Sequence, residues 1–347
     1  MADKTLPTIS VLMPTLNREK IIGEALKSIR EQDYPQNKIE IIIADAGSKD
    51  KTLEIAQKYG AKIYPNPLKT AEAGKAVALK HAKGDFIALI DSDNVLPTKN
   101  WLREMLVPFA DPEIVGSEPI AFAYRKKDGF IDRYCALLGM NDPYCLFQGV
   151  YDRYSYLTGK WTGRKLKQED ERYYLKIELN RNNLPTPTIG ANGTVFRKSF
   201  LEQNKIGKYF YDIDILTMAL EKDKKIYFAK VKNEIIHYYS GSNLRTFIRK
   251  QERRIRDNRL YRKVSLRRYD WGSVNRFGVF KFSIPTILTF PLVVQSIIGF
   301  AKKPDLAWFF HPIACWLTLI IYSFYSLKSL LIPEDFVQIK KWRRNYQ

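Results

Sequence analysis

Two aspartates one residue apart give the clearest chemical signal in this sequence. Asp91 and Asp93 directly follow the apolar run Phe86–Ile90, which is typical of a buried strand in a parallel sheet. Open α/β sheets bind ligands at the carboxyl ends of their strands. Two hard carboxylate ligands at such an edge suit Mg²⁺ or Mn²⁺ shared with a phosphate. A second Asp-x-Asp pair is formed by Asp212 and Asp214.

Two further polar loops are expected at the same edge of the sheet. Pro14 to Asn17 and Asp45 to Asp50 each follow a predicted strand, so their side chains should converge with the Asp91 loop. Taken singly, each loop also fits an ordinary helix cap. Three polar loops meeting at one edge favour a binding site.

The sequence has no glycine-rich phosphate-binding loop. Neither the P-loop nor the dinucleotide fingerprint occurs, which argues against an ATPase and against a dehydrogenase. A nucleotide bound here would instead need a metal ion and a lysine on its diphosphate. Lys75, directly after Gly74, is the candidate lysine, and a solvated helix position is the alternative for it.

Predicted strands and helices alternate over the first hundred residues. The apolar periodicity predicts strands at 8–13, 39–44, 61–64 and 85–90, and helices at 19–32, 51–59 and 73–82. This order predicts an α/β domain with a mostly parallel sheet and helices on both faces. Residues 120–190 show few clear periods. Further along we expect a helix at 214–221 and strands at 226–229 and 234–237.

Charge and apolar content are concentrated in the last third of the chain. The net charge is +20, and residues 245–281 hold 13 Lys or Arg and 3 acids. Two uncharged segments follow, 282–300 and 306–327. The length of each is close to the ~20 residues that a helix needs to cross a bilayer. Two buried core helices are the alternative. Pro285 and Pro291 would allow the first segment to be kinked or re-entrant.

Basic residues on both sides of these segments predict the topology. Basic residues favour the cytosolic side of a membrane. They are abundant in the block 245–281 and in the tail around Lys340 to Arg344, so both flanks are predicted to be cytosolic. Lys302 and Lys303, in the turn between the segments, oppose this orientation with only two charges. We therefore expect a multi-pass membrane protein with two spans and a cytosolic catalytic domain. The block would also attract anionic lipid headgroups.

Other classes of protein fit the sequence less well. A nucleic-acid surface is the competing interpretation of the basic block, but two apolar segments adjoin it, so no nucleic-acid partner is expected. The first apolar run, Ile9 to Met13, is too short for a signal peptide. The three cysteines form neither a metal-binding spacing nor a disulfide framework, which favours a reducing compartment.

Taken together, these motifs resemble the nucleotide-sugar half of glycosyltransferase family 2. The loops at 14–17, 45–50 and 91–93, together with Gly74-Lys75 and the segment 82–85, occur in the family's order and at its usual separations. The resemblance covers residues 8–120 well and 188–240 moderately. It implies a GT-A fold, a UDP- or GDP-sugar donor, a divalent metal (Mn²⁺ or Mg²⁺) and inversion at the sugar carbon.

The resemblance also implies roles for individual residues. Asp45 would hold the nucleotide base, Asp91 would face the ribose or diphosphate, and Asp93 would ligate the metal. Asp91 and His237 are further candidate metal ligands, with a structural role as the alternative for His237. The residues expected to bind the nucleotide sugar are Pro14, Thr15, Asn17, Asp45, Lys75, Asp91, Ser92 and Asp93.

The second half of the chain resembles the acceptor side of the family. The segment 190–193 matches its acceptor loop and contributes Asn192. Asp212 matches the general base, because an attacking sugar hydroxyl must lose a proton to a positioned carboxylate. A helix cap is the alternative for Asp212. Asp214 is assigned to the acceptor side, and Tyr211 stands where Glu is usual in the family.

A last motif lies in the basic block. Gln251 and Arg254 fit the Gln-x-x-Arg-Trp box of membrane-bound, polymer-making members, with Ile255 in place of the Trp. The box would place an arginine on the departing diphosphate, where charge develops in the transition state. A basic, membrane-facing helix is the alternative.

The sequence thus predicts a membrane-anchored, inverting, metal-dependent hexosyltransferase. It would move a sugar from a UDP- or GDP-sugar to a lipid-linked glycan or polysaccharide acceptor. A polyprenyl phosphate acceptor, which is already ionised and needs no base, is the alternative. A processive polysaccharide synthase is a remoter one, because two spans can hardly form a polymer channel. A decayed, non-catalytic scaffold is disfavoured by the intact Asp91 and Asp93.

The expected organisation follows from these assignments. The predicted segments are a catalytic GT-A domain at 1–240 with an insertion at 120–190 on the acceptor side, a basic juxtamembrane segment at 241–281, two transmembrane helices within 282–331, and a basic cytosolic tail at 332–347.

Overall fold

The computed structural model describes residues 6–223, 225–263, 268–269 and 277–331. The chain divides into two compact units. The sheet unit comprises Met1–Ala123 and Lys165–His237, and the helical unit comprises Tyr124–Arg164 and Tyr238–Gln347.

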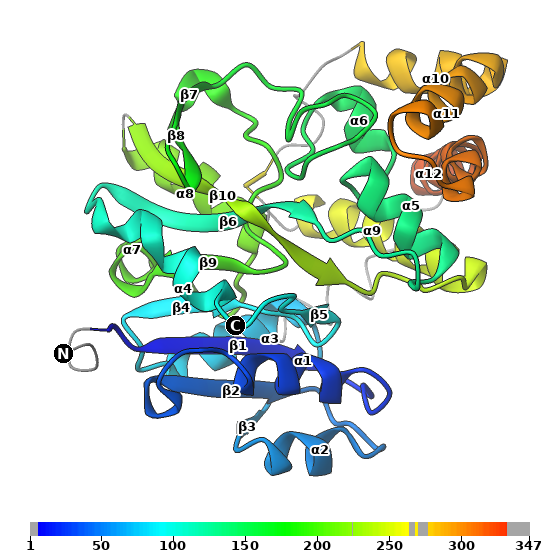
Figure 1. Ribbon diagram of the computed structural model, residues 1–347. Helices are drawn as coiled ribbons and strands as arrows, with labels where there is room; N and C mark the ends of the chain where they lie inside the picture. The colour runs from blue at the N-terminus through cyan, green and yellow to red at the C-terminus, as the bar shows by residue number, and fades with distance from the viewer. Residues whose placement is uncertain (1–5, 224, 264–267, 270–276, 332–347) are drawn as a thin grey trace. The chain divides into compact units, whose positions relative to one another are not determined.

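A mixed sheet of ten strands organises the described part of the sheet unit (Figure 1). Its order is β3-β2-β1-β4-β9-β6-β10-β8-β7, and β5 pairs with β10. The strands are β1 (Ile9–Thr15), β2 (Ile39–Asp45), β3 (Lys62–Pro65), β4 (Phe86–Leu89), β5 (Asn94–Val95), β6 (Ile114–Phe122), β7 (Lys167–Asp170), β8 (Tyr174–Asn180), β9 (Thr194–Arg197) and β10 (Lys225–His237).

The direction of the strands decides which loops meet. β1 is parallel to β2 and β4, and β2 is parallel to β3. β9 is antiparallel to both β4 and β6, and β10 is parallel to β6. It follows that β1, β2, β4, β6 and β10 all point the same way. Their carboxyl ends, together with the loop that enters β9, lie on one edge of the sheet.

Helices and short 3₁₀ turns complete the sheet unit. α3 packs against β1 and β2, α1 packs against α2, and α4 packs against β6 and β10. The elements are α1 (Ile22–Arg30), α2 (Thr52–Lys58), α3 (Ala71–His81), α4 (Trp101–Leu106), α7 (Lys198–Gln203), α8 (Ile215–Lys222) and the 3₁₀ turns η1 (Gln36–Lys38), η2 (Val107–Ala110), η3 (Arg181–Asn183) and η4 (Asp212–Asp214).

The sequence predictions for the first hundred residues are confirmed, with two differences further along. The predicted strands 226–229 and 234–237 form one strand, β10, whose pairing with β6 shifts register between Val231 and Glu234. The sheet as a whole is mixed, not mostly parallel, because β9, β8 and β7 enter it antiparallel. An antiparallel strand has no crossover helix before it, so the strand–helix alternation could not predict it.

The helical unit has its own apolar core. Tyr134, Leu137, Phe247 and Trp308 are fully or almost fully buried in one cluster. The helices of this unit are α5 (Phe130–Leu138), α6 (Tyr144–Gln148), α9 (Leu244–Lys263), α10 (Gly278–Leu288), α11 (Phe290–Lys302), α12 (His311–Leu331) and the 3₁₀ turn η5 (Leu306–Phe310).

The predicted segments of the second half divide differently in the structure. Residues 124–164 of the predicted insertion belong to the helical unit, and residues 165–190 belong to the sheet unit, where they form β7 and β8. The predicted tail 332–347 and part of the basic block lie outside the described residues.

Helices that are apolar enough to cross a membrane are few in the described part of the chain. By length and composition, Leu306–Lys328 is one candidate span. α10 and α11 qualify only as a pair, and the two helices are bent by 90° at the break between them. The prediction of two transmembrane helices therefore stays a prediction.

Candidate functional site

The sheet edge brings the predicted donor and acceptor residues of the sheet unit together. β1 ends at Thr15 and β2 at Asp45, and these two residues are paired in register. β4 leads directly into the Asp91 loop, and β10 ends at His237. The polar loops that the sequence placed at one edge do lie there, since their strands run in the same direction.

The first two loops fix each other. One carboxylate oxygen of Asp45 accepts hydrogen bonds from the backbone N–H of Gly47 (2.8 Å) and Ser48 (2.7 Å). The other accepts the hydroxyls of Thr15 (3.0 Å) and Ser48 (2.5 Å). Asn17, which has a left-handed backbone with φ 52°, donates its N–H to the Ser48 hydroxyl at 2.8 Å. Asp45 therefore holds the two loops together, and its contact with a nucleotide base stays a prediction.

α3 carries Lys75 into the site. Gly74, one residue before it, lies so close to β1 that a Cβ at this position would be 2.8 Å from the Cβ of Pro14. The Lys75 ammonium is buried, hydrogen-bonds the Asp212 carboxylate and lies 3.8 Å from Oδ1 of Asp91. Burial alone lowers the pKa of Lys75, but the carboxylates of Asp212 and Asp91 outweigh it and raise the pKa. Lys75 thus links the predicted donor side and the predicted base.

The Asp91 loop and the end of β10 form a second pair. Oδ1 of Asp93 lies 3.9 Å from Nε2 of His237, and both side chains are largely buried. The backbone N–H of Asp91 donates to Oδ1 of Asn94 at 3.0 Å, which holds the loop in a turn, and Ser92 is buried within it. Burial raises the pKa of Asp91, and Lys75 counteracts this.

These side chains fit a divalent cation that is shared with a substrate. Among the residues that the structure describes, no group of three or more His, Cys, Asp or Glu side chains is arranged as a metal cage. Mg²⁺ and similar ions are usually bound by one or two carboxylates while substrate phosphates and water supply the remaining ligands. Asp93 and His237, with Asp91 nearby, offer a donor set of this kind.

The predicted acceptor loop is packed against Asp212. Gly190 has φ 137°, and a Cβ there would lie 2.4 Å from the carbonyl oxygen of Asp212. Only glycine permits so close an approach. The Asn192 side chain, in the same loop, accepts a hydrogen bond from the Asn94 amide at 3.1 Å. Asp214 is almost fully buried, in contrast to Asp212.

A buried ion pair behind this loop was missed by the sequence analysis. Oε2 of Glu118 lies 2.6 Å from Nζ of Lys230, and neither side chain is exposed. Oε1 of Glu118 accepts the N–H of Gly190 (3.0 Å) and the hydroxyl of Thr194 (2.8 Å). The pair therefore holds both ends of the acceptor loop. The available signal was an acid, Glu118, within the mostly apolar segment of β6, and a lysine, Lys230, between the apolar residues Ala229 and Val231 of β10.

Gln251 and Arg254 lie in the helical unit, where they have partners of their own. The Gln251 amide donates to the carbonyl of Asn141 at 2.9 Å and accepts from Arg254 at 2.7 Å. The Asp142 carboxylate lies 3.4 Å from Arg254 and accepts the Tyr322 hydroxyl at 2.5 Å. This network gives Asn141 and Asp142, to which the sequence assigned no chemistry, a structural role. A contact between Arg254 and a diphosphate stays a prediction.

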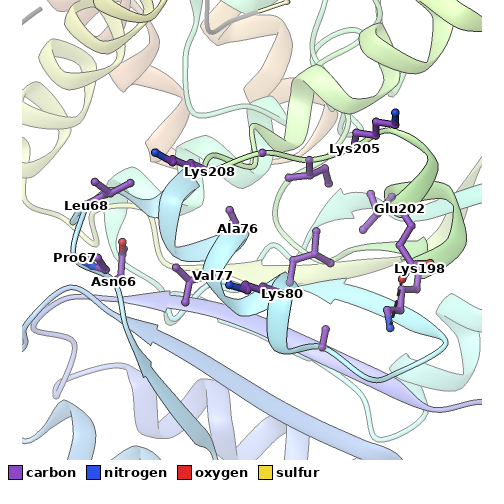
Figure 2. A pocket seen from close by; sticks show the side chains of 15 residues that line it. Asn66, Pro67, Leu68, Ala76, Val77, Lys80, Lys198, Glu202, Lys205 and Lys208 are labelled. Carbon is purple, nitrogen blue, oxygen red and sulfur yellow. Dashed lines mark ion pairs between the residues drawn. The ribbon is translucent and has the colours of Figure 1, made fainter. Parts of the chain in front are cut away.

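A cavity of about 580 Å³ lies along α3, between this helix and α7 (Figure 2). Lys80 comes from α3, Lys198 and Glu202 from α7, and Lys205 and Lys208 from the segment that leads to Asp212. Lys198 and Glu202 form an ion pair at 3.6 Å, so the rim is positive overall. The aliphatic lining consists of Leu68, Val77, Leu79, Leu201 and Ile206. We call this cavity the lysine groove, and its rim suits an anionic ligand.

Comparison with known proteins agrees with the geometry. Residues 10–204, more than half of the chain, match Glycosyl transferase family 2. Poly(ribitol-phosphate) beta-N-acetylglucosaminyltransferase TarS of Staphylococcus aureus is 40% identical over 101 residues, which is 27% of this chain and 18% of that protein. The GalNAc(5)-diNAcBac-PP-undecaprenol beta-1,3-glucosyltransferase of Campylobacter jejuni is 24% identical over 233 residues, covering 65% of this chain and 63% of that protein.

These matches span less than two thirds of the relatives' own lengths. Among solved structures, the mannosyltransferase PcManGT from Pyrobaculum calidifontis, in complex with GDP-Man and Mn²⁺, superimposes with a TM-score of 0.50 at 15% identity, covering 92% of this chain and 88% of that one. This likeness shows the shared GT-A fold. With the family match over most of the sheet unit, it leads to one conclusion: the chain belongs to glycosyltransferase family 2.

Proposed function

We propose that this protein is an inverting, metal-dependent hexosyltransferase that moves a sugar from a UDP- or GDP-sugar to a glycan hydroxyl. The observation that carries the proposal is the position of Lys75. Its ammonium is shared between Asp91, on the predicted donor side, and Asp212, the predicted base. A cation between two such carboxylates suits a site where a diphosphate and an attacking hydroxyl must meet.

The donor side is built from the first two loops and the Asp91 loop. In this proposal the nucleotide lies over Pro14, Thr15, Asn17 and Asp45, and its diphosphate approaches Lys75. Asp93, His237 and Asp91 would hold Mn²⁺ or Mg²⁺, which offsets the charge of the phosphates. The hydrogen bonds among Thr15, Asn17 and Asp45 support this assignment, because they hold the loops in place before a ligand arrives.

Asp212 takes the proton of the acceptor hydroxyl. While Lys75 binds the Asp212 carboxylate, that carboxylate is occupied. A donor diphosphate competes for Lys75, because a phosphate is a strong acceptor for an ammonium. Donor binding would therefore release Asp212 for the hydroxyl. We infer an ordered reaction in which the nucleotide sugar binds first.

The lysine groove favours an anionic acceptor. Its rim carries Lys80, Lys198, Lys205 and Lys208 against the single acid Glu202. The segment with Lys205 and Lys208 leads directly to Asp212, so an acceptor chain that follows this segment would reach the base. The names of the two relatives above include a poly(ribitol-phosphate) and an undecaprenol-linked diphosphate. A glycan that carries phosphate or is linked to a lipid phosphate is therefore the proposed acceptor.

A polyprenyl phosphate that accepts the sugar directly is the second candidate. It needs no base, because its oxygen is already ionised. The helical unit, with its apolar helices and basic α9, supports membrane association of either enzyme, with the catalytic chemistry on the cytosolic side.

The direct test is a thermal-shift panel of nucleotides with Mn²⁺. We expect UDP or GDP to raise the melting temperature of the full chain only when Mn²⁺ is present. Asp93→Asn should remove this shift, whereas Asp33→Asn, at an exposed carboxylate, should keep it. If no nucleotide raises the melting temperature with Mn²⁺, the proposed donor site is wrong.

A further inference from the structure

Large apolar side chains that stay exposed are concentrated in one stretch of the helical unit. Of the 21 such side chains in the described part of the chain, 17 lie between residues 277 and 327. Soluble monomers rarely leave so much apolar surface exposed without a partner. These side chains come from α10 and the residue before it, α11, η5 and α12: Phe277, Val279, Phe280, Ile284, Ile287, Leu288, Phe290, Val293, Ile297, Ile298, Phe300, Leu306, Phe309, Ile313, Ile320, Phe324 and Leu327.

Neither α10 nor α11 can cross a bilayer on its own. α10 has 11 residues and α11 has 13, so they are about 16 and 20 Å long at ~1.5 Å per residue. A hydrocarbon core is about 30 Å thick. The two helices meet at Thr289, which has φ 61°, and are bent by 90°. A right-angled pair of short apolar helices fits the surface of a bilayer better than its interior.

α12 is long enough to span but is bound along its length by a charged helix. Phe247 of α9 packs on Phe310, just before α12, with ring centroids 5.4 Å apart. The Tyr322 hydroxyl lies 3.3 Å from Oε1 of Gln251, and Arg259 donates to the Ser326 hydroxyl at 2.6 Å.

The high charge of α9 is unfavourable beside a transmembrane helix. Its sequence holds nine Lys or Arg and two acids, and the Arg256 side chain is 60% exposed. A charged side chain in hydrocarbon is costly unless it faces a partner or water. If α12 crossed the membrane, α9 would enter the hydrocarbon beside it.

The other end of α12 is also bound to polar residues of the helical unit. In the turn before η5, the Asp305 carboxylate accepts Arg133 at 2.9 Å and the Tyr124 hydroxyl at 2.6 Å. Lys302, at the end of α11, donates to the carbonyl of Leu157 at 2.7 Å. A spanning helix has its two ends on opposite sides of the bilayer. Here both ends contact polar segments of one compact unit.

We propose that α10, α11 and the exposed side of α12 bind one leaflet of an anionic lipid bilayer without crossing it. Interfacial helices of this kind bury their apolar side chains at the headgroup boundary and keep basic residues on the polar side. The exposed arginines of α9 supply attraction to anionic headgroups. This inference deepens the proposed membrane association and rests on it, but it is independent of the transferase chemistry.

Cysteine labelling in sealed, inside-out vesicles from expressing cells tests the topology. Arg256→Cys and Lys302→Cys are compared in the full chain, using a membrane-impermeant maleimide. We expect both positions to be labelled without detergent, because both lie on the cytosolic side. The parent chain gives the background, since its three cysteines are buried. If Lys302→Cys is protected until detergent is added while Arg256→Cys is labelled, the chain crosses the membrane and the proposal is overturned.

Flotation with vesicles of phosphatidylcholine, with and without phosphatidylglycerol, tests the binding face. We expect the parent chain to float mainly with vesicles that contain phosphatidylglycerol. Ile284→Glu with Ile287→Glu, at side chains that are 53% and 61% exposed, should weaken this binding about tenfold or more. Tyr173→Glu, at a side chain 51% exposed in the sheet unit, is the matched control and should keep it.

The outcomes of the two experiments separate the proposals. If the double variant floats as the parent does, or if it loses self-association in solution instead of lipid binding, the apolar face serves another partner and the inference is overturned. Nucleotide-dependent thermal stabilisation should be unchanged in this variant. If the parent chain floats as expected but no nucleotide stabilises it in the presence of Mn²⁺, the proposed function alone is contradicted.

Discussion

The sheet unit and the helical unit each contain a cluster of opposite charges, and the two clusters differ in exposure. At the sheet edge, the side chains of Asp91 and Asp212 around Lys75 are 27% and 16% exposed. In the helical unit, Asp142 beside Arg254 is only 5% exposed. The acids of the first cluster can therefore be reached by a ligand, whereas the acid of the second is covered by its own partners.

The chemistry of the two clusters follows from this difference. Lys75 bridges two acids from different loops, so a competing anion can replace either one. The Asp142 carboxylate instead accepts the Tyr322 hydroxyl and pairs with Arg254. The Gln251 amide donates to the carbonyl of Asn141, next to Asp142. These contacts all join segments of the helical unit. If the proposed function holds, similar residue types supply a reaction in one place and a scaffold in another. The amount of solvent at the site and the availability of partners decide which role they take.

The largest expected effect is on the reaction itself. Asp212→Asn should reduce kcat for a glycan hydroxyl by about 10²–10⁴-fold, because the amide cannot take the proton. Nucleotide-sugar affinity should not fall, because an amide competes less strongly than a carboxylate for the Lys75 ammonium. Steady-state kinetics and calorimetry measure the two quantities, with Asp223→Asn, eleven residues further along the chain, as the control. Near-normal transfer by Asp212→Asn would favour the polyprenyl phosphate acceptor, which needs no base.

The buried pair behind the acceptor loop should be the most sensitive point for stability. Glu118→Gln leaves the Lys230 ammonium without its carboxylate and should lower the free energy of unfolding by about 3–5 kcal/mol. The double change Glu118→Gln with Lys230→Met should recover much of this loss. Denaturant unfolding measures both variants. If the single and double variants are equally unstable, the ion pair is not what makes Glu118 important.

A carboxyl group of the helical unit should make stability depend on pH. Burial raises the pKa of Asp132 to about 6, although the backbone N–H groups of Ser240 and Gly241 donate to it. Because the folded chain holds this proton more tightly than the unfolded chain, the contribution to stability is present below about pH 4 and is lost as the pH rises through 6. The expected loss is about 3 kcal/mol.

Asp132→Asn should remove this pH dependence, since an amide does not ionise between pH 4 and 6. Unfolding curves of the parent and the variant, measured at several pH values, give the difference directly. The two should have similar stability at pH 4 and diverge at higher pH, with the variant more stable. Parallel curves across the whole range would contradict the assignment.

Arg254 tests whether the two clusters are truly separate. Arg254→Leu should lower the free energy of unfolding by about 1.5–3 kcal/mol, the range for hydrogen bonds to charged groups, and leave nucleotide-sugar affinity unchanged. Arg256→Leu, at an exposed side chain of the same helix, is the control for the loss of one charge. A selective, tenfold loss of donor affinity in Arg254→Leu would instead show that this arginine reaches the diphosphate.

The smallest expected effect concerns the lysine groove. Lys205→Glu should raise KM for a phosphate-bearing acceptor about threefold, in the range of exposed charge pairs, and less at high salt. KM for the nucleotide sugar should stay constant. Lys99→Glu, exposed elsewhere on the sheet unit, is the control. An equal effect of both variants would mean that net charge, and not the groove, attracts the acceptor.

The first four strands could be predicted because each is a short, mostly apolar run between polar loops. Residues 167–180 could not, since β7 is exposed and polar, and β8 is a partly buried antiparallel strand in which Lys176 and Glu178 alternate with the buried Ile177 and Leu179. The division at Tyr124 and Lys165 was also hidden, because it depends on packing between segments far apart in the sequence.

The site was predictable to the same extent. Asp91, Asp93 and Asn17 follow predicted parallel strands, so topology alone brings them to one edge. The contact between Lys75 and Asp212 joins residues 137 positions apart, and no local pattern reports it. The role of Glu118 needed the pairing of β6 with β10, which the sequence did not reveal because β10 appeared as two strands.

One consequence concerns the ends of two neighbouring strands. β6 ends at Phe122 and β10 at His237, and the chain passes into the helical unit within two residues of each. A candidate metal ligand is thus joined by a single peptide bond to the part of the chain that would be anchored on lipid. β10 pairs with β6 over most of its length, with β8 over Lys225–Val231, and with β5 at Ile236 and His237. A load on the anchored segment would therefore be resisted at His237 by β5, the short strand that directly follows the Asp91 loop.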